Sequence, residues 1–196
     1  MSSMGYSNGK GLGKYENGIK VPIEATPNNK KGQPRKLMCI MSDSMMNNID
    51  PSRLTNNRNM DVELFCHGGC TLECAYSHLP DIVKKKPDYI LLHIGTNNCG
   101  KDTSDTIINK IDKLKIHIQC QLPGCTTYYS LPIIRTDDHK ASTILLNVNK
   151  KIRLSNYLFL DNFNIKKKHL GVKGLHLNAR GVSLLAGNIL SLVGSL

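Results

Sequence analysis

The 196-residue sequence contains no tryptophan and only three phenylalanines, and aromatic residues make up 5% of it. It also lacks an uninterrupted apolar run of about 20 residues, the length that a membrane-spanning helix requires. Its first 20 residues are polar and resemble neither a signal peptide nor a transit peptide. These absences argue against a membrane-spanning or secreted protein, and they predict an intracellular one, in the cytoplasm or the nucleus.

Acidic residues are also scarce. The chain has 15 Asp and Glu against 26 Lys and Arg, which gives a formal net charge of +11. The excess is uneven, because residues 1–36 hold seven basic and two acidic side chains. A basic segment favours polyanionic partners such as nucleic acid, although a solubilising tail without a partner would have the same composition. The hydrophobic content of 40% is typical of a folded domain, and the length suits one domain with an appendage.

The seven cysteines are an odd number, which does not suit a complete disulfide framework. Cys66, Cys70 and Cys74 follow one another at intervals of four, with His67 and His78 nearby. This spacing invites a metal site, but the chain has no matched second pair of ligands of the kind that zinc modules show. The sequence therefore favours reduced, partly buried thiols and predicts neither a metal site nor a cofactor.

Residues 4–23 are rich in glycine, which permits tight turns but cannot build a core. We expect this arm to be disordered until it meets a partner. It resembles the G-patch, a glycine-rich motif associated with nucleic acid, through Tyr6, Gly9, Lys10, Gly11, Leu12, Gly13, Lys14 and Gly18. The resemblance implies binding of RNA or DNA through these residues, and a helicase as a further partner. A generic glycine-rich linker is the alternative interpretation.

Three regions follow from composition: a G-patch-like segment over residues 1–24, a linker over 25–35 and a globular domain over 36–196. Within the domain, short apolar runs alternate with helical periodicity, and Pro80 is expected to kink or divide the first helix. Strands are predicted at 36–41, 60–65, 87–94, 126–134 and 157–160, and helices at 72–86, 103–121, 141–156 and 177–196. This alternation predicts about five parallel strands in a three-layer α/β/α sandwich.

Four residues of the domain stand where an α/β enzyme places its chemistry. Ser44, Gly69 and Asn97 each follow a predicted strand, and His176 precedes the last helix. Because parallel strands end at one edge of a sheet, we expect these residues to lie close together. Ser44 could then act as nucleophile and His176 as general base, with the Ser44 and Gly69 amides and the Asn97 side chain as oxyanion donors. Taken singly, each is also an ordinary turn or surface residue.

The four segments together resemble the SGNH (GDSL-type) hydrolases, named for the Ser, Gly, Asn and His of their sequence blocks. The matching blocks are Ser42-Asp43-Ser44, Gly69-Cys70-Thr71, Gly95-Thr96-Asn97 and Gly174-Leu175-His176-Leu177-Asn178. The resemblance implies a flavodoxin-like fold, no metal, and hydrolysis of an ester-type substrate. The stretches PDYILLHIGTNN and GLHLNARG are similar to esterase-like domains carried by retroelements.

The last block departs from the family pattern in one respect. Lys173 stands three residues before His176, where the family has the Asp that orients the imidazole. A protonated lysine cannot accept a hydrogen bond from imidazole Nδ1–H, and its charge disfavours the imidazolium ion. A backbone carbonyl, or Asp161 at the end of the last strand, could orient His176 instead. Two hypotheses follow: a Ser-His dyad esterase, or a catalytically impaired nucleic-acid-binding accessory protein that uses its arm and basic surface.

Overall fold

The computed structural model describes residues 34–55 and 60–196. The G-patch-like segment 1–24, with Tyr6 and the other residues named above, lies outside the described residues, as does most of the predicted linker. Residues 35–196 form one compact unit. Within the described residues, no helix combines the length and the hydropathy needed to span a bilayer.

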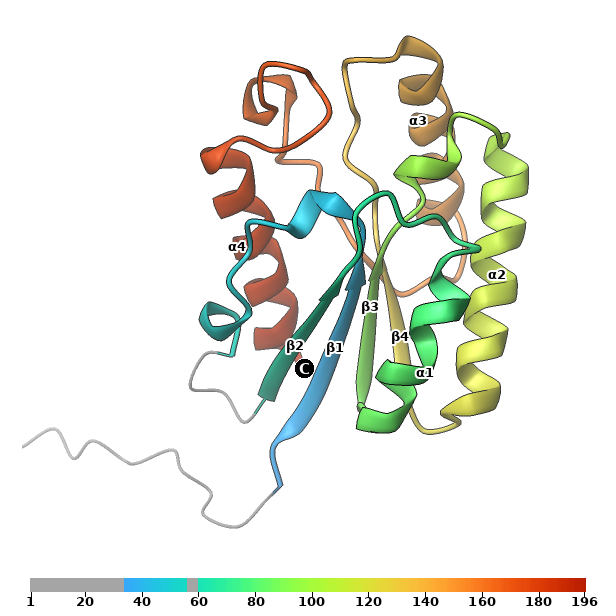
Figure 1. Cartoon of the computed structure of the whole chain (residues 1–196), viewed down its shortest axis with the longest axis vertical. Coiled ribbons are helices and arrows are strands. Elements are labelled where there is room, and N and C mark those ends of the chain that lie inside the picture. The colour runs from blue at the N-terminus through green and yellow to red at the C-terminus, as the bar shows by residue number, and fades with distance from the viewer. Residues whose placement is uncertain (1–33, 56–59) are drawn as a thin grey trace, which may run out of the picture. The chain divides into compact units, whose positions relative to one another are not determined.

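The compact unit is built on a five-stranded parallel sheet with the strand order β2-β1-β3-β4-β5 (Figure 1). The strands are β1 (Lys36–Ser42), β2 (Met60–Cys66), β3 (Tyr89–His93), β4 (Thr126–Ser130) and β5 (Phe159–Leu160). This is the flavodoxin-like order, in which the chain reverses direction across the sheet next to β1. The predicted fold class is confirmed.

Four helices cover the two faces of the sheet (Figure 1). They are α1 (Ala75–Lys85), α2 (Ser104–Gln121), α3 (His139–Arg153) and α4 (Ala179–Ser195). Along β1, Cys39 and Met41 enter the core beneath α1, α2 and α3, whereas Met38 and Ile40 enter the core beneath α4. All four side chains are completely buried, which explains why this strand reads as an unbroken apolar run.

The register of the sheet brings three strand ends into one row. Ser42 pairs with Cys66 on one side and with His93 on the other. The segments that leave β1, β2 and β3 therefore start side by side at the carboxyl edge. Two of them turn at once into short 3-10 helices, η1 (Ser44–Met46) and η3 (Thr96–Asn98).

Two parts of the sequence-based prediction do not hold: the division of the first helix at Pro80 and the extent of the fourth strand. Pro80 does not divide α1, because the helix continues through it while the neighbouring Leu79 and Ile82 stay buried against the sheet. The strand predicted to reach residue 134 ends at Ser130. The next residues pass Pro132, which cannot donate to a strand ladder, yet Leu131 and Ile133 remain buried. The apolar pattern in the sequence therefore continues past the last residue that pairs in the strand.

Candidate active site

Ser44 is the first residue of η1, directly after the buried end of β1. Asp43 caps this turn, because its Oδ1 accepts the Met45 N–H at 2.9 Å. The Asp43 N–H donates to the His93 carbonyl at 3.3 Å, and its own carbonyl accepts from the Cys66 thiol at 2.8 Å. The turn is thus fastened to both neighbouring strands, and Ser44 is left half-buried at the rim.

His176 lies in the loop that leads into α4, and its imidazole meets Ser44. Its Nε2 is 3.0 Å from Ser44 Oγ, although 132 residues separate the two in the chain. This separation is within hydrogen-bonding reach of a nucleophile and its base. The structure therefore brings together the two residues that the sequence nominated as nucleophile and general base.

The backbone around His176 is held from several directions. Leu170 and Leu177 form an antiparallel bridge, and the Gly171 N–H donates to the His176 carbonyl at 2.7 Å. Thr136, in the loop after β4, donates its N–H to the Gly174 carbonyl at 2.8 Å. Gly174 has a φ of +68°, and a Cβ there would collide with the Thr136 hydroxyl, so the position requires glycine.

The two remaining candidate residues meet at the next strand ends. Gly69 sits in an exposed turn with a φ of +72°, where the Cys70 N–H donates to the His67 carbonyl at 3.1 Å. Asn97 lies in η3, and its Nδ2 donates to the Cys70 carbonyl at 3.0 Å. One of the two Asn97 amide protons thus tethers the Gly69 turn, which leaves the second for an acceptor in the site.

Asn98 is a structural residue that the sequence analysis did not single out. It is buried, and its Oδ1 accepts the Leu72 N–H at 2.9 Å. Its Nδ2 donates to Asp102 at 2.7 Å and to Glu73 at 3.0 Å. The residue therefore joins the loop before α1 to the loop before α2. The adjacent asparagines 97 and 98 were its only signal in the sequence.

A buried polar network lies at the carboxyl ends of β3 and β4. His93 Nδ1 is 2.8 Å from Ser130 Oγ, and the same Oγ accepts a hydrogen bond from Asn162 Nδ2 at 3.0 Å. Asn188 of α4 donates to Asn162 Oδ1 at 3.0 Å. Burial lowers the pKa of His93 to about 4, so its ring is neutral at physiological pH. In the sequence, His93 stands out only as one residue of an apolar strand.

Asp161 does not take the place of the missing triad acid. Both of its carboxylate oxygens accept from the Arg153 guanidinium, at 2.8 and 2.9 Å, and this pairing holds the pKa of Asp161 below its ordinary value. The expectation that Asp161 orients His176 was therefore wrong. Among residues 34–55 and 60–196, no carboxylate is hydrogen-bonded to His176, and Lys173 is exposed to solvent.

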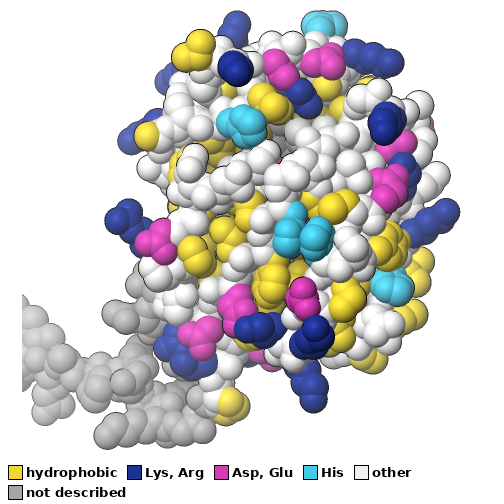
Figure 2. Space-filling view, in the orientation of Figure 1, with side chains coloured by type: hydrophobic (Ala, Val, Ile, Leu, Met, Phe, Trp, Pro, Cys, Tyr) yellow, Lys and Arg dark blue, Asp and Glu magenta, His cyan; other side chains and the backbone are white. Residues whose placement is uncertain are grey.

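The charges around the site are mixed. Burial raises the pKa of Asp43 to about 6, against the opposing effects of the Met45 N–H and the Arg135 charge. Arg135 in turn donates to Asp137 at 2.6 Å. On the face shown in Figure 2, Lys and Arg side chains are scattered around the rim among Asp and Glu and do not gather into one patch.

Solved structures with a similar fold include proteins described as lipases, acylhydrolases and esterases. A protein of the lipolytic G-D-S-L family from Veillonella parvula superposes with a TM-score of 0.68 at 16% identity, covering 82% of this chain and 100% of its own. A lipase/acylhydrolase from Enterococcus faecalis gives 0.66 at 15% identity, with 82% and 97% coverage. Residues 35–196 have the GDSL-hydrolase fold. A psychrotrophic esterase from Pseudoalteromonas matches this GDSL-fold domain with a TM-score of 0.64 at 12% identity, with 82% and 97% coverage.

The N-terminal segment matches a different family. Residues 1–35 fit the model of the G-patch domain. A stretch of 31 residues is 64% identical to the endogenous retrovirus group K member 21 Pro protein of Homo sapiens, and 61% identical to the member 113 Pro protein. Each match covers 16% of this chain, which spans about a fifth of the length of these curated relatives. The chain thus joins a G-patch to a GDSL-fold domain.

Proposed function

We propose that the GDSL-fold domain is a serine hydrolase of esters or related acyl compounds, and that the G-patch associates it with nucleic acid. The observation that carries the first part is the 3.0 Å separation between Ser44 Oγ and His176 Nε2 at the carboxyl edge of this fold. The acidic member that completes such a site in a triad has no counterpart among the described side chains, so the active unit is a dyad.

In the proposed reaction, Ser44 Oγ attacks the acyl carbon while its proton passes to His176 Nε2. The carbonyl electron pair moves onto oxygen, where the Ser44 and Gly69 amides and the free Asn97 amide proton can donate to it. His176 then returns the proton to the departing alkoxide, and the alcohol leaves an acyl-Ser44 ester. A water molecule, deprotonated by His176, attacks this ester, releases the acid and restores Ser44.

In this dyad, no carboxylate among the described residues orients His176 or stabilises its imidazolium form. His176 can accept a proton at Nε2 only when Nδ1 carries the other proton, and an Asp normally selects this tautomer and stabilises the imidazolium. In the serine-protease case, neutralising that Asp lowers turnover by about 10⁴-fold, or about 5 kcal/mol of transition-state stabilisation. We therefore expect turnover well below that of an intact triad.

Covalent labelling tests this proposal without requiring rapid turnover. A fluorophosphonate transfers its phosphonyl group to an activated serine and releases fluoride, with His176 taking the serine proton. We expect the full chain to be labelled at Ser44, as located by peptide mass mapping, and to hydrolyse a short-chain nitrophenyl ester. Ser44→Ala should lose both activities, whereas Ser191→Ala, which alters an exposed serine of α4, should keep both.

Labelling that persists in the Ser44→Ala variant, or an absence of both labelling and hydrolysis in the wild type, would reject the hydrolase. The chain would then be an accessory protein that keeps the GDSL-hydrolase fold without its chemistry, and the G-patch would carry its function.

The association with nucleic acid rests on the G-patch match over residues 1–35 and on the basic charge of that segment. The retroviral Pro proteins that share the 31-residue stretch support a retroelement origin for the chain. A helicase is the second partner that the motif supports. In this interpretation the arm recruits the domain to RNA or DNA. On the face shown in Figure 2, the basic side chains of the domain are scattered and form no continuous stripe.

Anisotropy of a fluorescent single-stranded RNA, measured with the full chain over a range of salt concentrations, tests this association. Replacing Lys10 and Lys14 with Ala should weaken binding and reduce the salt slope by about 0.7 for each phosphate that the variant no longer neutralises. The matched control replaces Lys113 and Lys140 with Ala, which removes the same charge from exposed positions of the domain. Equal weakening in both double variants would indicate nonspecific attraction to the whole basic chain.

A further inference from the structure

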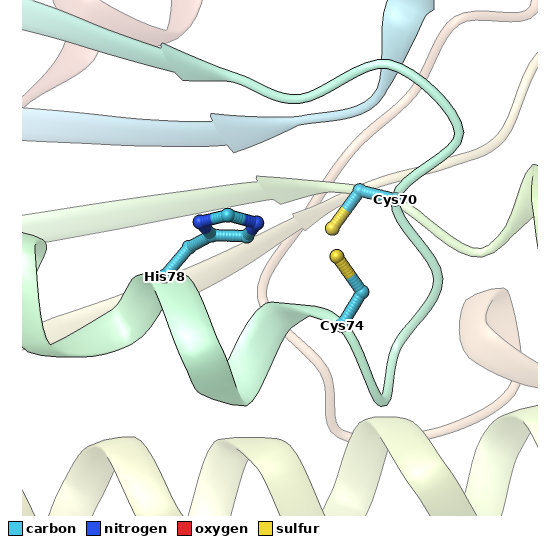
Figure 3. Close-up of side chains that lie close together, drawn as sticks. All are labelled: Cys70, Cys74 and His78. Atoms are coloured by element: carbon cyan, nitrogen blue, oxygen red, sulfur yellow. The ribbon is translucent and has the colours of Figure 1, made fainter.

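Three metal-ligating side chains converge beside the Gly69 turn (Figure 3). The Cys70 and Cys74 sulfurs and a ring nitrogen of His78 all lie within 4.8 Å of one another. Cys70 ends the turn that follows β2, Cys74 immediately precedes α1, and His78 lies one helical turn further along. Residues four apart share a face of a helix, so Cys74 and His78 project together toward Cys70.

We propose that Cys70, Cys74 and His78 form a binding site for a thiophilic divalent cation, of which Zn²⁺ is the representative. In a tetrahedral zinc site with metal–sulfur distances of about 2.3 Å and metal–nitrogen distances of about 2.0 Å, two sulfurs lie roughly 3.8 Å apart and a sulfur and a nitrogen roughly 3.5 Å apart. The separations in the cluster, at most 4.8 Å, exceed these values by no more than about 1 Å. Three residues separate Cys70 from Cys74 and Cys74 from His78, a spacing within the range that zinc sites use.

A fourth position remains for solvent. The His67 ring stacks on the His78 ring with centroids 3.4 Å apart and planes 8° from parallel. Parallel planes direct the nitrogen lone pairs of the two rings side by side, so they do not converge on one ion. We therefore assign three protein ligands to the site, with water completing the tetrahedron.

The surroundings suit such a site. Cys70 is 1% exposed, whereas Cys74 and His78 are half-buried, so an ion can enter from the solvent side and meet a dry inner ligand. No residue outside the described part of the chain competes for the ion through a thiol or an imidazole, because residues 1–33 and 56–59 contain neither cysteine nor histidine.

Binding of a cation at this site would affect the candidate active site through Cys70, which belongs to both. The Cys70 carbonyl accepts the Asn97 amide, and Cys70 directly follows Gly69. A metal that holds the Cys70 sulfur to α1 would thus restrain the turn that carries the Gly69 amide, and with it the carbonyl to which the Asn97 side chain is bound. The thiols bind as thiolates, so uptake of the cation releases their protons to solvent and weakens as the pH falls.

Cobalt substitution tests the site directly. The reduced, metal-free full chain is titrated with Co²⁺ in the absence of oxygen, and thiolate-to-cobalt charge-transfer absorption is followed. We expect saturation at one ion per chain, displacement by one equivalent of Zn²⁺, and a higher melting temperature with Zn²⁺. Cys74→Ser and His78→Ala should each lose the saturable band and the thermal shift.

Two variants serve as matched controls: Cys120→Ser removes an exposed thiol of α2, and His117→Ala removes an imidazole from the same helix. Both should keep the band. An absent band, or one that survives Cys74→Ser or is lost in Cys120→Ser, would overturn the proposal. Conversion of Cys70 and Cys74 to a disulfide in a chain whose reduced form takes up no Co²⁺ would also overturn it and would identify a redox pair instead.

Discussion

Replacing Lys173 with Asp is expected to increase ester hydrolysis by about 10²-fold, with an upper limit of about 10⁴-fold set by the effect of a triad Asp elsewhere. An Asp at this position supplies the carboxylate that His176 lacks. It can accept the Nδ1 proton, select the tautomer in which Nε2 receives the Ser44 proton, and stabilise the imidazolium. Initial rates of short-chain ester hydrolysis by the two full-length proteins measure the gain.

The backbone favours this result. Gly171 donates to the His176 carbonyl, and Gly174 donates to the Gly171 carbonyl at 2.8 Å, so the turn that contains residue 173 is tied to that of the histidine. Lys173 is exposed, and replacing it disturbs no buried contact.

Two controls separate orientation from charge. Lys168→Asp makes the same change in net charge in the preceding 3-10 helix, η4 (Lys167–His169), and should leave the rate nearly unchanged. Lys173→Ala removes the positive charge without supplying an acceptor and should give only a small gain. If Lys173→Asp hydrolyses no faster than Lys173→Ala, the imidazole orientation does not limit the reaction. If the gain from Lys173→Asp disappears when Ser44→Ala is added, the added activity belongs to the Ser44–His176 dyad.

The second large effect is expected at Asp43, whose burial raises its pKa from the ordinary value of about 3.9 to about 6. The folded protein thus holds this proton more tightly than the unfolded chain does. Burying the ionised carboxylate therefore lowers the free energy of unfolding. This penalty is absent below about pH 4, develops as the pH rises, and is complete above about pH 6. A shift of this size corresponds to at most about 3 kcal/mol.

Asp43→Asn should therefore raise the free energy of unfolding above about pH 6 and change it little near pH 4. The Asn side-chain oxygen can still accept the Met45 N–H, so the cap of η1 is kept while the buried charge is removed. Urea unfolding of both proteins across this pH range measures the difference. Lower stability of Asp43→Asn at neutral pH would show that the ionised carboxylate is stabilised in the folded state.

Asp137→Asn provides a control of opposite sign. Arg135 donates to the Asp137 carboxylate and holds its pKa below the ordinary value. The stabilisation from this carboxylate is present above the unfolded pKa and is lost as the pH falls through the folded pKa. The Asn variant should therefore be less stable than the wild type at neutral pH and approach it in acid.

Much of the fold was predictable because local patterns encode it. The strand β3 reads as an apolar run because it is buried on both faces. The helix α2 shows the stripe Ile107, Ile111 and Leu114 because it is buried on one face only. Element boundaries were less secure, since burial continues past the place where hydrogen bonding stops. Leu131 and Ile133 are buried like strand residues but follow the end of β4.

The candidate site likewise has a part that could be predicted from the sequence and a part that could not. The order of the blocks placed Ser44, Gly69, Asn97 and His176 at one sheet edge. The supporting contacts had no local signal, because each joins residues far apart in the chain. Asn98 bonds to the Leu72 amide across 26 positions, and Asn162 reaches Ser130 across 32.

By itself, the sequence determined the alternation of strands and helices, the parallel sheet and the identity of the candidate dyad. These features depend on side-chain periodicity and on residue types at strand ends, both of which are local. Only the tertiary structure decided that Ser44 and His176 touch, that Asp161 belongs to Arg153, and that two cysteines and a histidine converge. Such contacts depend on strand order, register and side-chain rotamers, and these are settled when the whole chain packs together.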